Sequence, residues 1–202
     1  MVNIPRKGCP EESLDGIYLA CPGASRGAVV AAPHPLYGGS MDSPVVNELA
    51  WAAQKAGMPS LRFNWRGVGA SAGRASGETQ DADEDYASAL AHLEATLDGP
   101  LVACGYSFGA AAAVRAGSGR RVDRLVLVAP PPALVAPEAL LATGRRCLVL
   151  VGARDGLAPV NALEAALSGA ARVTLHVIPG ADHFFAQGLA ELGQQAAAWL
   201  AA

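Results

Sequence analysis

The sequence has little of what would mark a nucleic-acid-binding or membrane protein. Charged residues make up 16% of its 202 residues, aromatic residues 5%, and the formal net charge is -3. Nucleic-acid partners usually require a basic patch, so we expect none here. No apolar run approaches the roughly 18 residues of a membrane span, and no apolar segment of signal-peptide length follows the first residues. We therefore expect a cytoplasmic protein that does not bind a membrane.

The small number of cysteines also limits the disulfides and metal sites that the chain could form. There are four, at positions 9, 21, 104 and 147, and they form neither a Cys-x-x-Cys pair nor the spacing of a metal site. Cys104 and Cys147 lie in apolar segments, where a free thiol acts as a small apolar side chain. A Cys9–Cys21 disulfide is the alternative for the other two, but a cytoplasmic setting favours free thiols. The sequence also lacks a Walker loop, a dinucleotide fingerprint and a cluster of metal ligands, so we expect no cofactor and no metal.

Apolar segments and helical patterns alternate from residue 28 onward. Hydrophobic residues make up 51% of the chain, which is long enough for one domain with a full core. Strands are expected at residues 28–32, 60–64, 100–104, 125–129, 147–151 and 173–178, with helices between most of them. This alternation predicts an α/β fold with a mainly parallel sheet covered on both faces. Residues 2–4 and 14–19 add two strands, expected to be antiparallel, for a sheet of about eight. We find no linker, so residues 1–202 are expected to form a single domain.

Three local features refine this expectation. Ser43 can cap a helix that has Pro44 in its first turn and ends before Gly57. The acids at positions 81, 83, 84 and 85 begin another helix, where they complement its dipole, and a metal site is the alternative reading. The buried stripe of that helix is expected to run from Ala82 to Leu97.

Residues 105–109 read Gly-Tyr-Ser-Phe-Gly between an apolar strand and an alanine-rich helix. This is the pattern of a nucleophile elbow, in which a tight turn exposes the serine hydroxyl and places the next N–H at a helix start. Side chains at Gly105 and Gly109 would collide with the neighbouring elements. Ser107 is therefore the candidate nucleophile, and an ordinary loop is the alternative.

A serine hydroxyl needs a base, and the base needs a group that orients it. Of the four histidines, His34 lies in a glycine-rich loop, and His92 and His176 lie within a predicted helix and strand. His183 follows the last strand, at the sheet edge where Ser107 is expected. Asp155 follows the preceding strand and is the candidate third member, with a turn-forming role as the alternative. Asp182 is a weaker candidate because adjacent residues rarely point at each other.

The chain order Ser107, Asp155, His183 is that of α/β-hydrolases. With the loop at residues 66–71, Arg-Gly-Val-Gly-Ala-Ser, and the loop at 34–39, His-Pro-Leu-Tyr-Gly-Gly, the chain resembles the α/β-hydrolase superfamily over nearly its whole length. It is similar to a bacterial group of small hydrolases near the dienelactone-hydrolase-like and esterase families. Dienelactone hydrolase uses a cysteine nucleophile, and the serine here departs from that.

The resemblance implies further roles. The oxyanion hole would be formed by the N–H groups of Phe108 and Leu36, with Tyr37 in reserve, because Pro35 has no N–H. His34 would shape its loop, and Arg66 would have a structural role rather than bind a substrate carboxylate. Tyr37 and Tyr106 are the candidate substrate-binding residues, with packing as the alternative for both.

These features predict a serine hydrolase that cleaves small or short-chain carboxylic esters through an acyl-enzyme. The interval 130–146 is too short for a large helical cap, and few aromatic residues are present to line a deep acyl tunnel. A thioesterase is the nearest alternative, followed by an amide or peptide hydrolase and by a non-catalytic binding protein of the same fold. The sequence leaves the oligomeric state open, although the last strand is a candidate edge for pairing two subunits.

Overall fold

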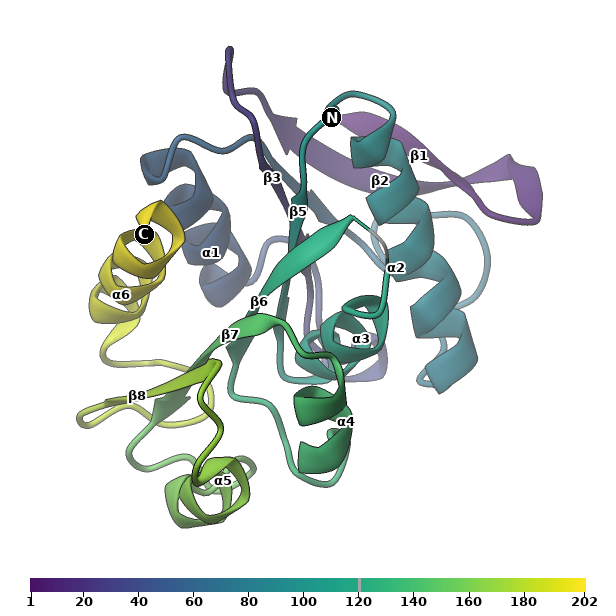
Figure 1. Cartoon of the computed structure of the whole chain (residues 1–202). Coiled ribbons are helices and arrows are strands. Elements are labelled where there is room, and N and C mark those ends of the chain that lie inside the picture. The colour runs from purple at the N-terminus through teal and green to yellow at the C-terminus, as the bar shows by residue number, and fades with distance from the viewer. Residues whose placement is uncertain (120) are drawn as a thin grey trace.

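The molecule is built on one eight-stranded sheet, in the order β1-β2-β4-β3-β5-β6-β7-β8 (Figure 1). The computed structural model describes residues 1–119 and 121–202. β2 pairs antiparallel with β1 and β4, and the pairings from β4 through β3 to β8 are parallel. The predicted mainly parallel α/β sheet is confirmed. Its strands are β1 (Val2–Arg6), β2 (Cys9–Leu19), β3 (Gly27–Ala31), β4 (Ser60–Phe63), β5 (Leu101–Tyr106), β6 (Val122–Val128), β7 (Arg146–Gly152) and β8 (Val173–Ile178).

Helices cover both faces of the sheet. On one face α1 packs against α6, and on the other α2 packs against α3, which in turn contacts α4 (Figure 1). Because both faces are covered, the two strands at the centre of the sheet, β3 and β5, carry no charged residue and are buried at every position. The helices are α1 (Pro44–Lys55), α2 (Thr79–Glu94), α3 (Phe108–Ala116), α4 (Pro137–Ala142), α5 (Val160–Leu167) and α6 (Leu189–Ala201).

Several element boundaries differ from the sequence prediction. The β1–β2 hairpin is longer than expected, because β2 begins at Cys9 in a polar stretch that gives no apolar signal. Leu97 does not belong to the stripe of α2, which ends at Glu94, although its side chain packs on the core from the following loop. Ser43 precedes α1, but its side chain makes no capping hydrogen bond. Gly57 ends this helix with a φ of 74°, as its position after Lys55 predicts.

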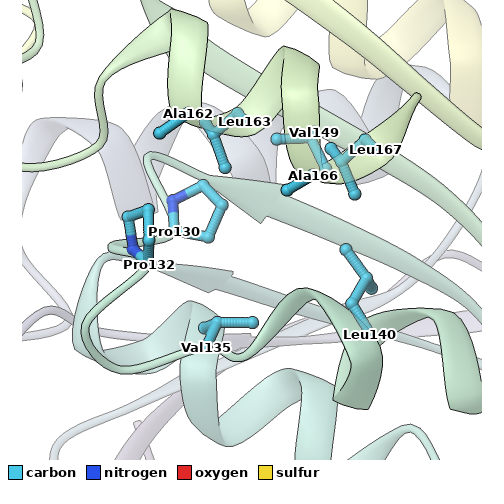
Figure 2. Close-up of a pocket in the computed structure, with 9 residues that line it drawn as sticks. All are labelled: Pro130, Pro132, Val135, Leu140, Val149, Ala162, Leu163, Ala166 and Leu167. Atoms are coloured by element: carbon cyan, nitrogen blue, oxygen red, sulfur yellow. The ribbon is translucent and has the colours of Figure 1, made fainter.

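The segment between β6 and β7 carries only the six-residue helix α4, so no cap domain covers the sheet edge in the described residues. α4 and α5 instead border a small apolar pocket of about 60 Å³ (Figure 2). Ser107 is not among the residues that line it. These are Pro130, Pro132, Val135, Leu140, Val149, Ala162, Leu163, Ala166 and Leu167.

No helix among the described residues is both long and apolar enough to cross a membrane. They also contain no group of three or more His, Cys, Asp or Glu side chains placed to hold a metal ion. All four cysteines are free thiols.

Candidate active site

Ser107 lies in a strained turn between β5 and α3. Its backbone angles are φ 54° and ψ -115°, a conformation that residues other than glycine rarely adopt. The strain is held in place because Ser107 N–H donates to the Val128 carbonyl of β6 at 2.9 Å and the Ser107 carbonyl begins the hydrogen bonding of α3. A strained residue that is fixed from both sides in this way is typical of a functional site.

The two glycines of the motif are required by close backbone contacts. A Cβ placed on Gly105 would lie 2.1 Å from the carbonyl oxygen of Gly109, in α3. A Cβ on Gly109 would lie 2.5 Å from the carbonyl oxygen of Ala32, just after β3. Both collisions involve backbone atoms and could not be relieved by a side-chain rotation. The expected reason for glycine at these two positions is therefore confirmed.

His183 bridges the serine and an aspartate. Its Nε2 lies 3.0 Å from Ser107 Oγ, and its Nδ1 lies 2.8 Å from Asp155 Oδ2. An ionised carboxylate can only accept, so Nδ1 carries the proton and Nε2 is left as an acceptor for the serine hydroxyl. The structure thus brings together Ser107, Asp155 and His183, the three residues that the sequence singled out.

Contacts between two turns hold the histidine and the aspartate together. Arg154 N–H, in the turn after β7, donates to the Ala181 carbonyl in the turn after β8, at 2.8 Å. A Cβ on Gly152 would lie 2.4 Å from the same carbonyl oxygen, so the two turns touch through their backbones. Because β7 and β8 are parallel neighbours, both turns leave the same edge of the sheet.

Hydrogen bonds to Asp155 favour its ionised form. Burial of the side chain opposes ionisation, but the hydrogen bond with His183 and those from the Ala158 and Leu157 N–H groups outweigh it. The pKa of the Asp155 carboxyl is lowered as a result. An ionised carboxylate at this position can orient the imidazole and stabilise its protonated form.

Asp182, the weaker candidate for the acid, has a different function in the turn. Its Oδ1 accepts the N–H groups of Phe184 at 3.1 Å and Ala186 at 3.2 Å. It therefore shapes the turn that carries His183, as aspartates commonly do.

The two N–H groups expected to form an oxyanion hole differ in their hydrogen bonding. In the described part of the chain, Phe108 N–H at the start of α3 donates to no protein acceptor. Leu36 N–H, in the short turn η1 (Pro35–Tyr37), donates to His34 Nδ1 at 3.2 Å, and Tyr37 N–H donates to the His34 carbonyl at 3.1 Å. The role of Leu36 stays a prediction, with the added condition that its N–H is shared with His34 or released from it.

His34 shapes the loop after β3, as expected. Besides accepting the Leu36 N–H, its ring packs between those of Tyr37 and Phe108, with centroids 4.7 and 4.6 Å away. Burial lowers the pKa of the His34 imidazole, which favours the neutral ring that can accept this hydrogen bond.

Of the two tyrosines expected to bind substrate, Tyr106 is mostly buried. Its hydroxyl donates to the His183 carbonyl oxygen at 2.9 Å, and burial raises its pKa. It thereby connects the strand that carries the serine with the turn that carries the histidine, although the residue also lines the cleft. Tyr37, in contrast, is highly exposed at the cleft.

A cleft of about 620 Å³ opens at Ser107 and His183. It is bordered by the loop after β3, by the start of α1 and by the turns after β7 and β8. Its lining residues are Pro33, His34, Tyr37, Gly38, Gly39, Ser43, Pro44, Tyr106, Ser107, Leu157, His183 and Phe184.

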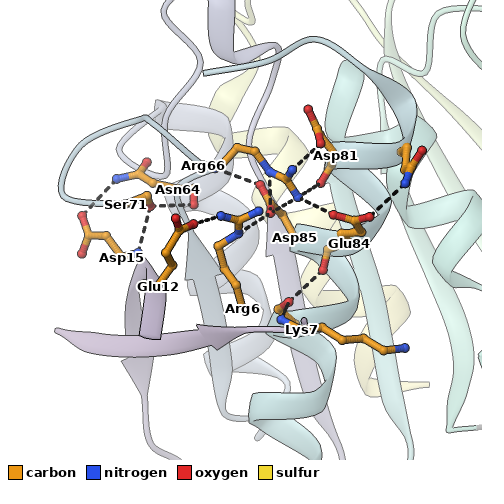
Figure 3. Close-up of polar contacts among 12 residues, drawn as sticks. Arg6, Lys7, Glu12, Asp15, Asn64, Arg66, Ser71, Asp81, Glu84 and Asp85 are labelled. Atoms are coloured by element: carbon orange, nitrogen blue, oxygen red, sulfur yellow. Dashed lines mark hydrogen bonds and ion pairs between the residues drawn. The ribbon is translucent and has the colours of Figure 1, made fainter. Parts of the chain in front are cut away.

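Arg66 does not line this cleft but lies in an ionic network with α2 (Figure 3). Its guanidinium donates to Asp85 Oδ1 from Nε at 3.0 Å and from Nη2 at 2.8 Å. The backbone N–H of Arg66 donates to Asp85 Oδ2 at 2.8 Å. It also pairs with Asp81 and with Glu84. The structural role expected for Arg66 is therefore supported. Three of the four acids at the start of α2 thus bind this arginine, and Asp83 pairs with Arg115 of α3. The alternative of a metal site finds no support in the described residues.

Four residues that complete the site could not be singled out from the sequence. Trp65 Nε1 donates to the carbonyls of Ala32 and Pro33, and Asn64 Oδ1 accepts Met41 N–H, so both fix the loop after β3. Leu157 and Phe184 line the cleft from the turns after β7 and β8. A position within two residues of Asp155 or His183 was the available signal for the last two.

Comparison with known proteins agrees with this architecture. A family model described as "Alpha/beta hydrolase domain" matches residues 34–200. No curated protein is a significant match to the sequence.

Solved structures give closer likenesses. An alpha-beta serine hydrolase homologue from Coxiella burnetii is 29% identical, with a TM-score of 0.85 over 98% of this chain and 97% of that one. A putative alpha/beta hydrolase from Agrobacterium tumefaciens is 27% identical, with a TM-score of 0.87 over 98% and 94%. A serine hydrolase without a lid from Xanthomonas campestris is 27% identical, with a TM-score of 0.83 over 96% and 90%.

Proposed function

Because the chain belongs to the alpha/beta hydrolase family, we propose that it is a serine hydrolase that cleaves small or short-chain carboxylic esters. The observation that carries this proposal is the position of the His183 ring, 3.0 Å from Ser107 Oγ and 2.8 Å from Asp155 Oδ2. A hydroxyl, a base and an orienting carboxylate in this arrangement have the chemistry needed for acyl transfer.

The proposed reaction has two halves. Ser107 Oγ attacks the ester carbonyl while His183 Nε2 takes its proton, and Asp155 stabilises the imidazolium that forms. The oxyanion is held by Phe108 N–H and, where it is shared or released by His34, by Leu36 N–H. His183 then gives the proton to the departing alcohol oxygen. In the second half, a water molecule gives a proton to His183 and attacks the acyl carbonyl. His183 then returns this proton to Ser107 Oγ as the bond between the acyl group and the serine breaks, which releases the acid.

The preference for small esters rests on the shape of the site. The cleft is open to solvent, and the described residues include no cap domain over it. A long acyl chain would therefore leave much of its apolar surface in water and gain little from binding. A short acyl group needs only the contacts close to the serine.

The test is hydrolysis of p-nitrophenyl esters of increasing acyl length. We expect kcat/KM to be highest for the short chains and kcat to fall by at least about 10³-fold in Ser107→Ala, since removal of a catalytic serine costs this much or more. Full activity in a folded Ser107→Ala variant would contradict the proposal. Absence of activity on every ester, with turnover of the matching thioesters, would instead identify a thioesterase.

A further inference from the structure

Three exposed apolar side chains surround the cleft. Tyr37, Leu157 and Phe184 are 86%, 59% and 73% exposed, and all three line it. Single exposed apolar residues are common, but several around one cleft are typical of a ligand site. Among the twelve lining residues found in the described chain, none is a lysine, arginine, aspartate or glutamate. The parts of a substrate that meet these side chains are therefore expected to be apolar.

The chemistry of acyl transfer orients an ester in this cleft. The departing alcohol oxygen must receive the proton of His183 Nε2, so the alcohol part lies on the His183 side. The Phe184 ring stands edge-on to the His183 ring, with centroids 5.6 Å apart. Leu157 N–H donates to Asp155 Oδ1 at 2.8 Å, which fixes its backbone beside the aspartate. Both apolar side chains thus lie where the alcohol would leave.

The outward position of Phe184 is imposed by its neighbours. Phe185 has a φ of 53°, a strained value for a bulky residue, and its buried ring packs edge-on against Tyr106. Asp182 Oδ1 fixes the same turn by accepting the Phe184 and Ala186 N–H groups. The turn therefore exposes the first of two adjacent phenylalanines, Phe184, and buries the second, Phe185. Strain that keeps an aromatic ring in water beside the catalytic histidine favours a binding role for that ring.

We propose that Phe184 and Leu157 form the subsite for the alcohol part of the ester, and that this part is a flat apolar group such as a benzyl or aryl group. Tyr37, on the side of the cleft formed by the loop after β3, contacts the acyl part. This assignment rests on the proposed ester hydrolysis and adds to it the class of ester that the site prefers.

The experiment compares two pairs of esters that share one half. Ethyl acetate and benzyl acetate differ only in the alcohol, whereas ethyl acetate and ethyl 3-phenylpropanoate differ only in the acyl group. We expect Phe184→Ala to lower the kcat/KM ratio of benzyl to ethyl acetate about five- to tenfold, which is the usual size of one aromatic contact. The ratio for the acyl pair should stay the same. Tyr37→Ala should lower the acyl ratio and leave the alcohol ratio unchanged.

A control variant separates the subsite from general effects of removing an aromatic ring. Trp51→Ala removes a half-exposed aromatic side chain of α1 that does not line the cleft, and it should leave both ratios unchanged. Equal ratios in wild type and Phe184→Ala, or an equal loss on both pairs, would overturn the subsite assignment. The proposed function would still stand if hydrolysis of ethyl acetate required Ser107. Both the subsite assignment and the proposed function would be overturned only if no ester were cleaved by Ser107.

Discussion

At the scale of single residues, the hydroxyl of Tyr106 has a positioning role that the Gly-x-Ser-x-Gly motif does not predict. It donates to the carbonyl of His183 at 2.9 Å from within the core, and so positions the candidate base relative to the candidate nucleophile. We expect Tyr106→Phe to keep the fold and to lower kcat about tenfold while KM changes less than about twofold, because substrate contacts remain but the histidine is less well placed.

Steady-state kinetics on one short ester would check this prediction. Tyr18→Phe, at a half-buried position in β2, is the matched control for removal of a tyrosine hydroxyl and should leave kcat unchanged. A Tyr106→Phe enzyme with wild-type kcat, or one that changes only in KM, would show that the hydroxyl does not position His183.

Asp155 gives a prediction about pH and stability. Its pKa in the folded protein is below the ordinary value of 3.8, so folding favours the ionised form. The stabilisation is complete above the unfolded-state pKa and is lost as the pH falls through the lower, folded-state pKa. Urea midpoints of wild type and Asp155→Asn should therefore differ more at about pH 6 than at about pH 3. A gap that widens in acid would contradict this account.

The sequence predicted which residues carry the chemistry of the site more fully than it predicted the contacts between them. Ser107, Asp155 and His183 were identifiable because each follows an apolar strand, and parallel strands deliver such residues to one edge. The hydrogen bond from Leu36 N–H to His34 was not identifiable, because it depends on the rotamer of a side chain two residues away. The exposure of Phe184 likewise depends on the backbone conformation of Phe185, which the residue type alone would not suggest.

At the scale of elements, Arg66 ties α2 to the loop after β4. The Asp85 side chain is almost fully buried and Arg66 mostly so, and they share three hydrogen bonds. Arg66→Met would remove the two side-chain hydrogen bonds and leave the buried carboxylate with the backbone N–H of residue 66 and with Arg6, 3.6 Å away. We expect a loss of about 3 kcal/mol in the free energy of unfolding, since removing the closer cation of a buried pair leaves the carboxylate poorly compensated.

The same helix supplies the control. Arg115 of α3 pairs with Asp83 of α2 at 2.6 Å, but both side chains are about a third exposed. Arg115→Met should cost no more than about 1 kcal/mol, as is usual for a solvent-exposed pair. Urea unfolding of the two variants measures both values. Equal losses would show that the Arg66 network is no more stabilising than a surface contact.

The elements themselves were largely predictable, and the failures have a common cause. Strands buried on both faces, such as β3 and most of β6, can be recognised in the sequence as apolar runs. The start of β2 at Cys9 cannot, because Cys9 joins the strand only by pairing with Arg6 of β1, and residues 10–12 lie where the register of this pairing shifts. Similarly, the acids of α2 were interpreted through the helix dipole, but Arg66, the partner of three of them, lies 15 or more residues earlier in the chain.

At the scale of the whole molecule, the sheet order determines the site. β5, β7 and β8 are parallel, so the turns that carry Ser107, Asp155 and His183 meet at one edge although they are far apart in sequence. The class of fold followed from the alternation of strands and helices. The placing of β4 between β2 and β3 could not be predicted, because a single sequence does not show which strands pair.

We propose that residues 1–202 fold as one domain, since one sheet runs from β1 to β8 and a single core cluster extends from Ile4 to Leu200. Thermal unfolding should then be a single cooperative transition, with the same midpoint by far-UV and near-UV circular dichroism. Two separated transitions would contradict a single domain.

The central claim is that Ser107 carries the acyl group during turnover, and the most direct measurement is mass spectrometry of the enzyme quenched in acid during turnover of p-nitrophenyl acetate. We predict a fraction of protein heavier by one acetyl group, with the modification on the peptide that contains Ser107 and absent from Ser107→Ala. Rapid hydrolysis by Ser107→Ala, or an acetyl group carried through turnover by a different residue, would contradict the account.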